Sequence, residues 1–232
     1  MVRTGSGAAS GSSGLREALL FFSTYLFPIV GFPLVSYAWW RTSGGSWPLT
    51  IVVMGVPVIF GYLMPAVATH VVKRWRFTSG PRLGSYYVHH GFIYASKLAF
   101  VLLLVVRSLD EIASAFDAAA VVVIAGAATA FGGWFHDAQA LRAGKIEMAG
   151  GGETLSTFAP QSYFAMGATY AGVTLAASRI LSASPEAVAW VFPASLILMC
   201  VIPTAVFLAV DPISRVALVN QMRRRSKTEV RT

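Results

Sequence analysis

Six long apolar stretches divide the chain, and short polar segments separate them. A helix needs about 20 apolar residues to cross the hydrocarbon core of a bilayer. The stretches of this length are Glu17–Trp40, Trp47–His70, Tyr87–Val106, Ile112–Phe135, Ser162–Leu181 and Ala187–Val210. Only 12% of the residues are charged, whereas a soluble domain uses about a quarter. The sequence therefore predicts an all-α integral membrane protein with six transmembrane helices.

The cationic residues are distributed unevenly among the polar segments. If the N-terminus is cytoplasmic, the outer loops contain only Arg41, Arg107 and Arg179, and Lys97 lies within an apolar stretch. The remaining cations then lie on the cytoplasmic side: Arg3, Arg16, Lys73, Arg74, Arg76, Arg82, Arg142, Lys145, Arg215, Arg223, Arg224, Arg225, Lys227 and Arg231. Cytoplasmic loops of membrane proteins carry such an excess of positive charge. We therefore predict a multi-pass protein of the cell inner membrane with both termini cytoplasmic.

The ends of the chain differ in composition from its middle. Residues 1–14 are mostly Gly, Ser and Ala and predict a flexible tail. Residues 15–215 form the expected six-helix transmembrane domain, and residues 216–232 form a basic cytoplasmic tail that suits anionic lipid headgroups. Membrane lipids are thus the expected partners. A nucleic-acid partner is not expected, because the cations lie between apolar blocks and not on a folded polar face.

Small residues recur at four-residue spacing in the fourth and fifth apolar stretches. The positions are Ala125, Thr129 and Gly133 in the fourth stretch, and Ala168, Gly172 and Ala176 in the fifth. Because lipid supplies no hydrophobic drive between helices, small residues at this spacing favour close backbone packing. Alanine-rich segments also match the pattern by composition alone. We expect these two helices to be central and tightly packed together.

Lys97 lies inside the third apolar stretch, near the predicted midplane of the bilayer. A charge at that depth costs about 2.5 kcal/mol or more, so it requires a partner or water. Tyr62, Tyr94 and Ser96 are the candidate partners, and no acidic residue lies at an obviously matching depth. Lys97 therefore has two interpretations. It contacts a substrate, ion or cofactor in an internal cavity, or it is structural. In the structural case it reaches the interface along its own apolar stem or bonds carbonyls that nearby prolines leave free.

All four histidines lie at the predicted cytoplasmic ends of helices. His70 closes the second helix, His89 and His90 open the third, and His136 closes the fourth beside Asp137. Imidazoles and carboxylates are usual ligands of zinc, iron and copper, so the four histidines are candidate ligands of a transition metal. Asp137 is instead suited to orient a histidine. The chain has no HExxH motif, and scattered interfacial histidines are the competing interpretation.

The segment after His136 favours a continued helix. Asp137, Leu141 and Lys145 share a helical face if the helix runs on, and Gly144 is a plausible stop. Glu147 follows in the same loop and is within reach of the histidines.

Three functions are consistent with this pattern. The first is an enzyme, or a subunit of one, acting on a hydrophobic substrate at the cytoplasmic interface, with His136, Asp137 and Lys97 as catalytic residues. The second is a transporter or channel unit that uses Lys97. The third is a non-catalytic subunit of a larger membrane complex, with other membrane subunits as partners. We favour the first, because the polar residues concentrate on one side of the predicted membrane.

Overall fold

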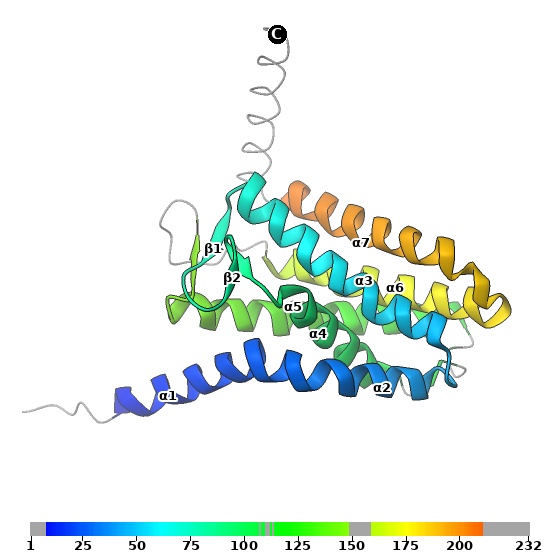
Figure 1. Cartoon of the computed structure of the whole chain (residues 1–232), viewed down its shortest axis with the longest axis horizontal. Coiled ribbons are helices and arrows are strands. Elements are labelled where there is room, and N and C mark those ends of the chain that lie inside the picture. Colours follow the sequence, from blue (N-terminus) through cyan, green and yellow to red (C-terminus); the bar gives the residue numbers. More distant parts are fainter. Residues whose placement is uncertain (1–7, 107, 110–111, 113, 149–158, 211–232) are drawn as a thin grey trace, which may run out of the picture.

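A computed structural model describes residues 8–106, 108–109, 112, 114–148 and 159–210, with side chains from residue 14 onward except residue 159. The described part is mostly helical, and the six apolar stretches each correspond to one helical body (Figure 1). In chain order the helices are α1 Ala8–Phe21, η1 Phe22–Gly31, α2 Phe32–Thr42, α3 Trp47–Ala66, η2 Val67–Val71, α4 His90–Val105, α5 Ala115–Arg142, α6 Ala159–Ala183, η3 Pro185–Ala187 and α7 Val188–Val210. The elements α1, η1 and α2 form one continuous rod, and so do α3 and η2.

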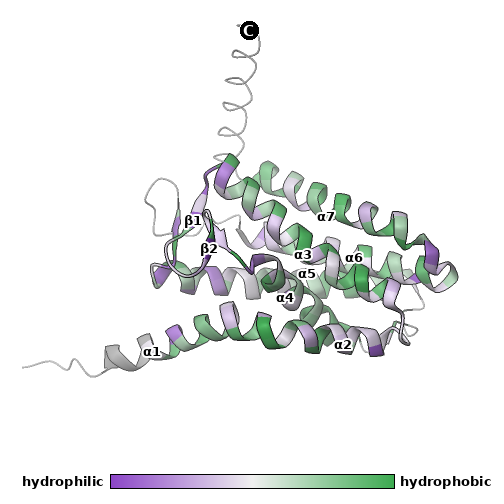
Figure 2. Cartoon of the chain, viewed as in Figure 1, coloured by the Kyte–Doolittle hydropathy of each residue, from purple (hydrophilic) through white to green (hydrophobic). Residues whose placement is uncertain are grey.

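Four helical bodies are long and apolar enough to cross a membrane. They are Gly14–Thr42, Trp47–Val71, Ala115–Arg142 and Pro185–Val210. The apolar helix α4 is shorter, at 16 residues. Figure 2 shows that apolar residues run along the bodies of the helices, and bulky side chains such as Phe116 and Ile29 are 81% and 69% exposed. Because soluble proteins rarely expose extended apolar surfaces, the structure is that of a multi-pass membrane protein.

The loops that the sequence places at the cytoplasmic side contain short strands, which the prediction of an all-helical chain missed. β1 Trp75–Phe77 pairs antiparallel with β4 Ile146–Met148, and β2 Arg82–Leu83 pairs with β3 Tyr86–Tyr87. Strands of two or three residues have too little alternating pattern to be seen in a sequence. Both ends of the described chain lie at this strand end of the bundle (Figure 1).

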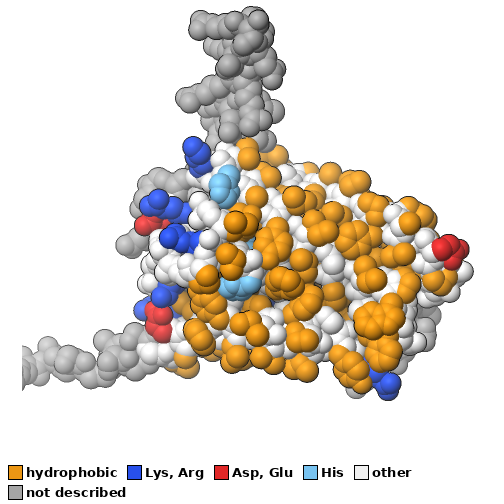
Figure 3. Space-filling model, viewed as in Figure 1, with side chains coloured by type: hydrophobic (Ala, Val, Ile, Leu, Met, Phe, Trp, Pro, Cys, Tyr) orange, Lys and Arg blue, Asp and Glu red, His pale blue; other side chains and the backbone are white. Residues whose placement is uncertain are grey.

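Charged residues gather at the strand end, as Figure 3 shows for the face in view. Arg76 on β1 forms an ion pair with Glu147 on β4, with Nη2 and Oε2 2.6 Å apart. Glu147 therefore braces the β1–β4 pair, because the two residues are partners in its register. The structure shows no contact between Glu147 and the histidines among the residues it describes.

Two helix boundaries differ from the sequence-based expectation. α1 begins at Ala8, within the segment predicted as a flexible tail, of which residues 1–7 lie outside the described part. α5 continues past His136 to Arg142, and Gly144 follows with a φ of 66°. This left-handed conformation favours glycine and ends the helix, which confirms the continuation and the stop. The basic tail at 216–232 also lies outside the described residues.

The close packing predicted for the fourth and fifth stretches is confirmed. α5 and α6 share the most extensive interface in the bundle. A methyl group on Gly167 would lie 2.4 Å from the Thr129 hydroxyl oxygen, so these backbones approach too closely for a larger residue. The expected central position holds for α6, where Tyr170, Ala171 and Thr174 are almost completely buried, but not for α5. The most apolar window of α3 is 44% buried, whereas that of α5 is 17% buried, so α3 lies deeper.

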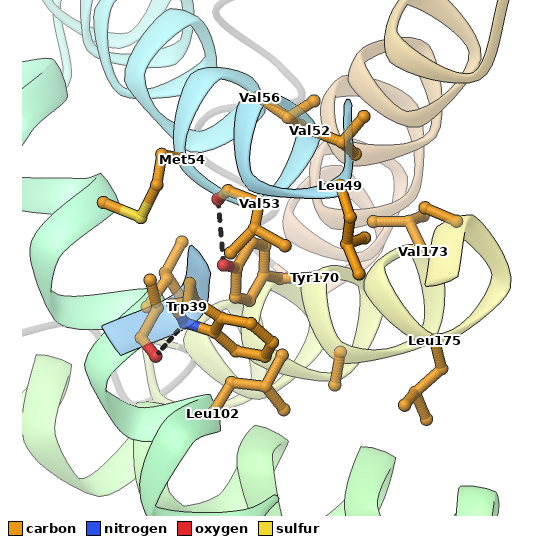
Figure 4. Close-up of a cluster of buried hydrophobic side chains, with 14 of the residues drawn as sticks. Trp39, Leu49, Val52, Val53, Met54, Val56, Leu102, Tyr170, Val173 and Leu175 are labelled. Carbon is orange, nitrogen blue, oxygen red and sulfur yellow. Dashed lines mark hydrogen bonds between the residues drawn. The ribbon is translucent and has the colours of Figure 1, made fainter. Parts of the chain in front are cut away.

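Two large polar–aromatic side chains join the core to the surrounding helices (Figure 4). The indole Nε1 of Trp39 on α2 donates to the carbonyl of Ala99 on α4, at 2.9 Å. The hydroxyl of Tyr170 on α6 donates to the carbonyl of Val53 on α3, also at 2.9 Å. Both side chains are almost completely buried, and a buried Trp or Tyr usually finds such a partner.

Replacing Tyr170 with phenylalanine is expected to lower the free energy of unfolding by about 1 kcal/mol, because only the hydrogen bond is lost. Unfolding in mixed micelles measures the effect. The matched control is Tyr37→Phe, since Tyr37 is 61% exposed; it should change stability by much less. Equal effects of the two variants would contradict the role of the Tyr170 hydroxyl.

Candidate functional site

Polar side chains from four helices meet near the strand end of the bundle. The contributing residues are Thr24 on η1, Lys97 on α4, His136 and Asp137 on α5, and Tyr163 on α6. We call these five residues the polar cluster. Three of them, His136, Asp137 and Lys97, are the catalytic candidates expected from the sequence, and the fold brings them together.

Asp137 is the centre of the polar cluster. Its Oδ1 lies 3.1 Å from Nδ1 of His136, and its Oδ2 accepts a hydrogen bond from the Tyr163 hydroxyl. A carboxylate only accepts hydrogen bonds, so Nδ1 of His136 carries the proton. In the neutral ring, Nε2 is then left with a free lone pair. Asp137 therefore orients His136 as a base, in the way that a carboxylate orients the catalytic histidine of hydrolytic enzymes.

Gly133 allows Tyr163 to reach Asp137. Gly133 and Asp137 are one helical turn apart on α5, so they lie on the same face of the helix. A methyl group on Gly133 would lie 2.7 Å from a ring carbon of Tyr163. The missing side chain thus lets the ring pack on the α5 backbone while its hydroxyl binds the carboxylate.

Thr24 belongs to an irregular part of the first helical body. The segment Phe22–Gly31 has π-helical hydrogen bonding and contains Pro28. Proline has no N–H, so Pro28 cannot donate to the carbonyl one α-helical turn earlier, which is that of Thr24. The Thr24 carbonyl instead accepts a hydrogen bond from Nε2 of His89, at 2.8 Å. The same residue turns its hydroxyl toward Nε2 of His136, at 3.5 Å.

Lys97 interacts electrostatically with Asp137 and His136. The sequence suggested no acid at its depth, and this expectation is wrong. Lys97 lies seven residues into α4, or about 10 Å along its axis, and Asp137 lies five residues before the end of α5, or about 8 Å. The depths match because α4 begins later, and α5 ends later, than the apolar pattern implies. Lys97 therefore lies within electrostatic range of Asp137 inside the bundle.

A cavity of about 90 Å³ lies beside the polar cluster and includes Thr24 and His136 in its wall. Glu17 on α1 and Lys145 also line it, and their charged atoms are 3.4 Å apart. Both side chains are partly exposed, at 50% and 37%. The cavity is therefore lined by a partly exposed ion pair on the side that faces the strand end of the protein.

Aromatic rings form a large part of the remaining cavity wall. Tyr87 on β3 stacks on Phe77, with ring centroids 4.0 Å apart, and meets Tyr25 edge-on. Burial, and secondarily the nearby Tyr25 phenol, raises the pKa of the Tyr87 phenol well above its ordinary value. Tyr87 is therefore neutral at physiological pH, and this wall carries no charge.

The four histidines do not converge on one point. His70 is exposed and pairs with Thr69, and His90 is buried among aromatic rings, including Trp75 and Phe77. His89 and His136 approach different atoms of Thr24. The described part of the chain contains no group of three or more His, Cys, Asp or Glu side chains that could hold a metal ion. The geometry gives the expected four-histidine metal site no support.

A second, larger hollow of about 890 Å³ lies between α5, α6 and α7. Its wall includes Ala130, Trp134 and Phe164. Trp134 faces away from His136, because residues two apart on a helix lie about 200° apart. This apolar groove shares no residue with the polar cluster.

Sequence reasoning missed Thr24 and Tyr163 as members of the site. In each case the sequence contains a helix-perturbing residue one turn away from a residue of the site. Pro28 follows Thr24 by one helical turn, and Gly133 precedes Asp137 by one turn. Neither signal identifies its partner, because the contacts join residues more than 25 positions apart.

Comparisons with protein-family models, with curated proteins and with solved structures found no match.

Proposed function

We propose that all six helical bodies cross the cell inner membrane and that the strand end faces the cytoplasm. The described cations support this orientation, because the strand end has Lys73, Arg74 and Arg82 whereas the other end has Arg41 and Arg179. The positive-inside rule relates such a bias to the cytoplasmic side. α4 would span about 24 Å, and its many buried positions suit a short helix enclosed by others.

We further propose that the protein is an enzyme, or the catalytic subunit of one, that acts on a hydrophobic substrate at the cytoplasmic interface. One observation carries this proposal. Asp137 holds His136 by Nδ1, and the free Nε2 faces Thr24 in the wall of a cavity. Such a histidine acts as a general base and then as a general acid.

Lys97 has a supporting role in this proposal. Its positive charge interacts favourably with Asp137, so it favours the carboxylate form that orients His136. Membrane lipids surround the protein and are a natural source of the substrate. A carboxylate, an imidazole and an ammonium group in one interior site are also typical of the functional sites of membrane proteins.

Replacing His136 with asparagine in the source organism tests the enzymatic function. We expect a hydrophobic metabolite to accumulate to the level found when the gene is deleted, because the general base is lost. Lipid extracts analysed by untargeted mass spectrometry measure the change. The matched control is His70→Asn, the same substitution at the same end of the bundle, which should leave the metabolites as in the wild type.

Two outcomes would contradict the enzymatic function. In one, deletion changes the hydrophobic metabolites but His136→Asn does not. In the other, neither changes them, as expected of a transporter of other solutes or of a non-catalytic subunit. Protein amounts in the membrane must be equal for the two histidine variants, and immunoblotting establishes this.

A further inference from the structure

The Thr24 hydroxyl is directed differently from several other hydroxyls in this bundle. In a helix, Ser and Thr hydroxyls commonly bond the carbonyl four residues earlier. Five side chains of this chain do so at 2.6 to 2.8 Å: Ser36, Thr50, Thr69, Ser96 and Ser182. The Thr24 hydroxyl instead lies 3.5 Å from Nε2 of His136. Thr24 lies in the π-helical segment Phe22–Gly31, and π-helical turns are frequent at functional sites.

The direction of the proton between Thr24 and His136 follows from their partners. Nδ1 of His136 donates to Asp137, so Nε2 of the neutral ring accepts, and the Thr24 hydroxyl must donate. A hydroxyl that donates to an oriented imidazole is the arrangement of an activated nucleophile. The distance is at the outer limit of a hydrogen bond, as is common before a substrate binds.

We propose that Thr24 is a catalytic nucleophile, that His136 is its base, and that the substrate is a carboxylic ester with a hydrophobic acyl chain. This inference rests on the enzymatic function proposed above. The cavity limits the size of the group that can enter it, because its volume of about 90 Å³ is far below the roughly 300 Å³ of an ordinary ligand pocket. Only the reacting carbonyl group enters it. The acyl chain stays outside, against apolar side chains at the rim such as Phe21, which is 61% exposed.

The reaction uses groups already in place. Thr24 Oγ1 attacks the carbonyl carbon of the ester while Nε2 of His136 takes the hydroxyl proton. The bond from the carbonyl carbon to the alkoxy oxygen then breaks, and the departing alcohol takes the proton from His136. A water molecule next attacks the acyl-Thr24, gives a proton to His136, and releases the acid as His136 returns that proton to Oγ1.

A β-lactone with a long alkyl chain tests the nucleophile directly on the purified full-length protein. Attack by a hydroxyl opens the four-membered ring, so no group leaves and the protein gains the whole mass of the probe. We expect one equivalent on Thr24 of the wild type, located by peptide mass spectrometry. Thr24→Val should lose the modification, Thr24→Ser should retain it, and His136→Asn should slow it by at least about 100-fold.

The inference is overturned if the wild type gains no mass, or if Thr24→Val is modified as fast as the wild type. Thr24→Ser is the control for misfolding. It keeps the hydroxyl and loses only a methyl group, so a folded Thr24→Ser protein should still be modified. The metabolite experiment separates this inference from the proposed function. If His136→Asn alters the metabolites and Thr24→Val does not, His136 remains the acid–base residue and Thr24 is not the nucleophile.

Discussion

Replacing Trp39 with alanine is expected to lower the free energy of unfolding by about 3–5 kcal/mol, the usual cost of removing a large buried aromatic side chain. Trp39 is fully buried and packs in the main core, and its indole also donates to the Ala99 carbonyl. Its loss leaves a cavity between α2 and α4 and removes the hydrogen bond that joins the two helices. The helices would be joined less firmly at the end opposite the strands.

Unfolding in mixed micelles, followed by circular dichroism, measures this effect. Trp190→Ala is the matched control, because Trp190 is 56% exposed and should cost much less. Trp39→Phe divides the two contributions, since it keeps most of the ring volume and removes the hydrogen bond. A Trp39→Ala variant as stable as the control would show that Trp39 does not anchor the first helical body.

The positions of the helices could be predicted from the sequence because the bilayer imposes a length and an apolar composition on each. All six stretches fall on helical bodies, although only four meet the criteria for a membrane span by themselves. The strands could not be predicted, because their pairing joins residues such as Arg76 and Glu147 that are distant in the sequence. The sequence also could not show that α3 is buried more deeply than α5. All the stretches are apolar, so their composition does not distinguish a buried helix from a lipid-facing one.

The candidate site could be predicted only in part, for a similar reason. His136, Asp137 and Lys97 stand out in the sequence because polar and charged groups are costly near the membrane interior. Thr24 does not stand out, because a threonine in an apolar helix usually bonds its own backbone. Its place in the π-helical segment around Pro28 and its contact with His136 are seen only in the structure.

Gly133→Ala is expected to lower the free energy of unfolding by about 1–3 kcal/mol, the usual cost of overpacking. The new methyl group would meet the ring of Tyr163 at 2.7 Å and push its hydroxyl away from Asp137. Gly132→Ala is a close control, because no atom lies within 4 Å of a methyl group there. Both variants gain the same helix propensity, about 1 kcal/mol, so the difference between them isolates the contact with Tyr163.

A double-mutant cycle assigns that difference to the tyrosine. In a Tyr163→Ala background the methyl group of Gly133→Ala has room, so its cost should largely disappear. The two single variants should also share one functional result, because each removes the hydroxyl from Asp137 and leaves His136 less firmly oriented. A cost at position 133 that persists without the tyrosine ring would mean that another part of α6 sets the close approach, and the link from Gly133 to the carboxylate would then be lost.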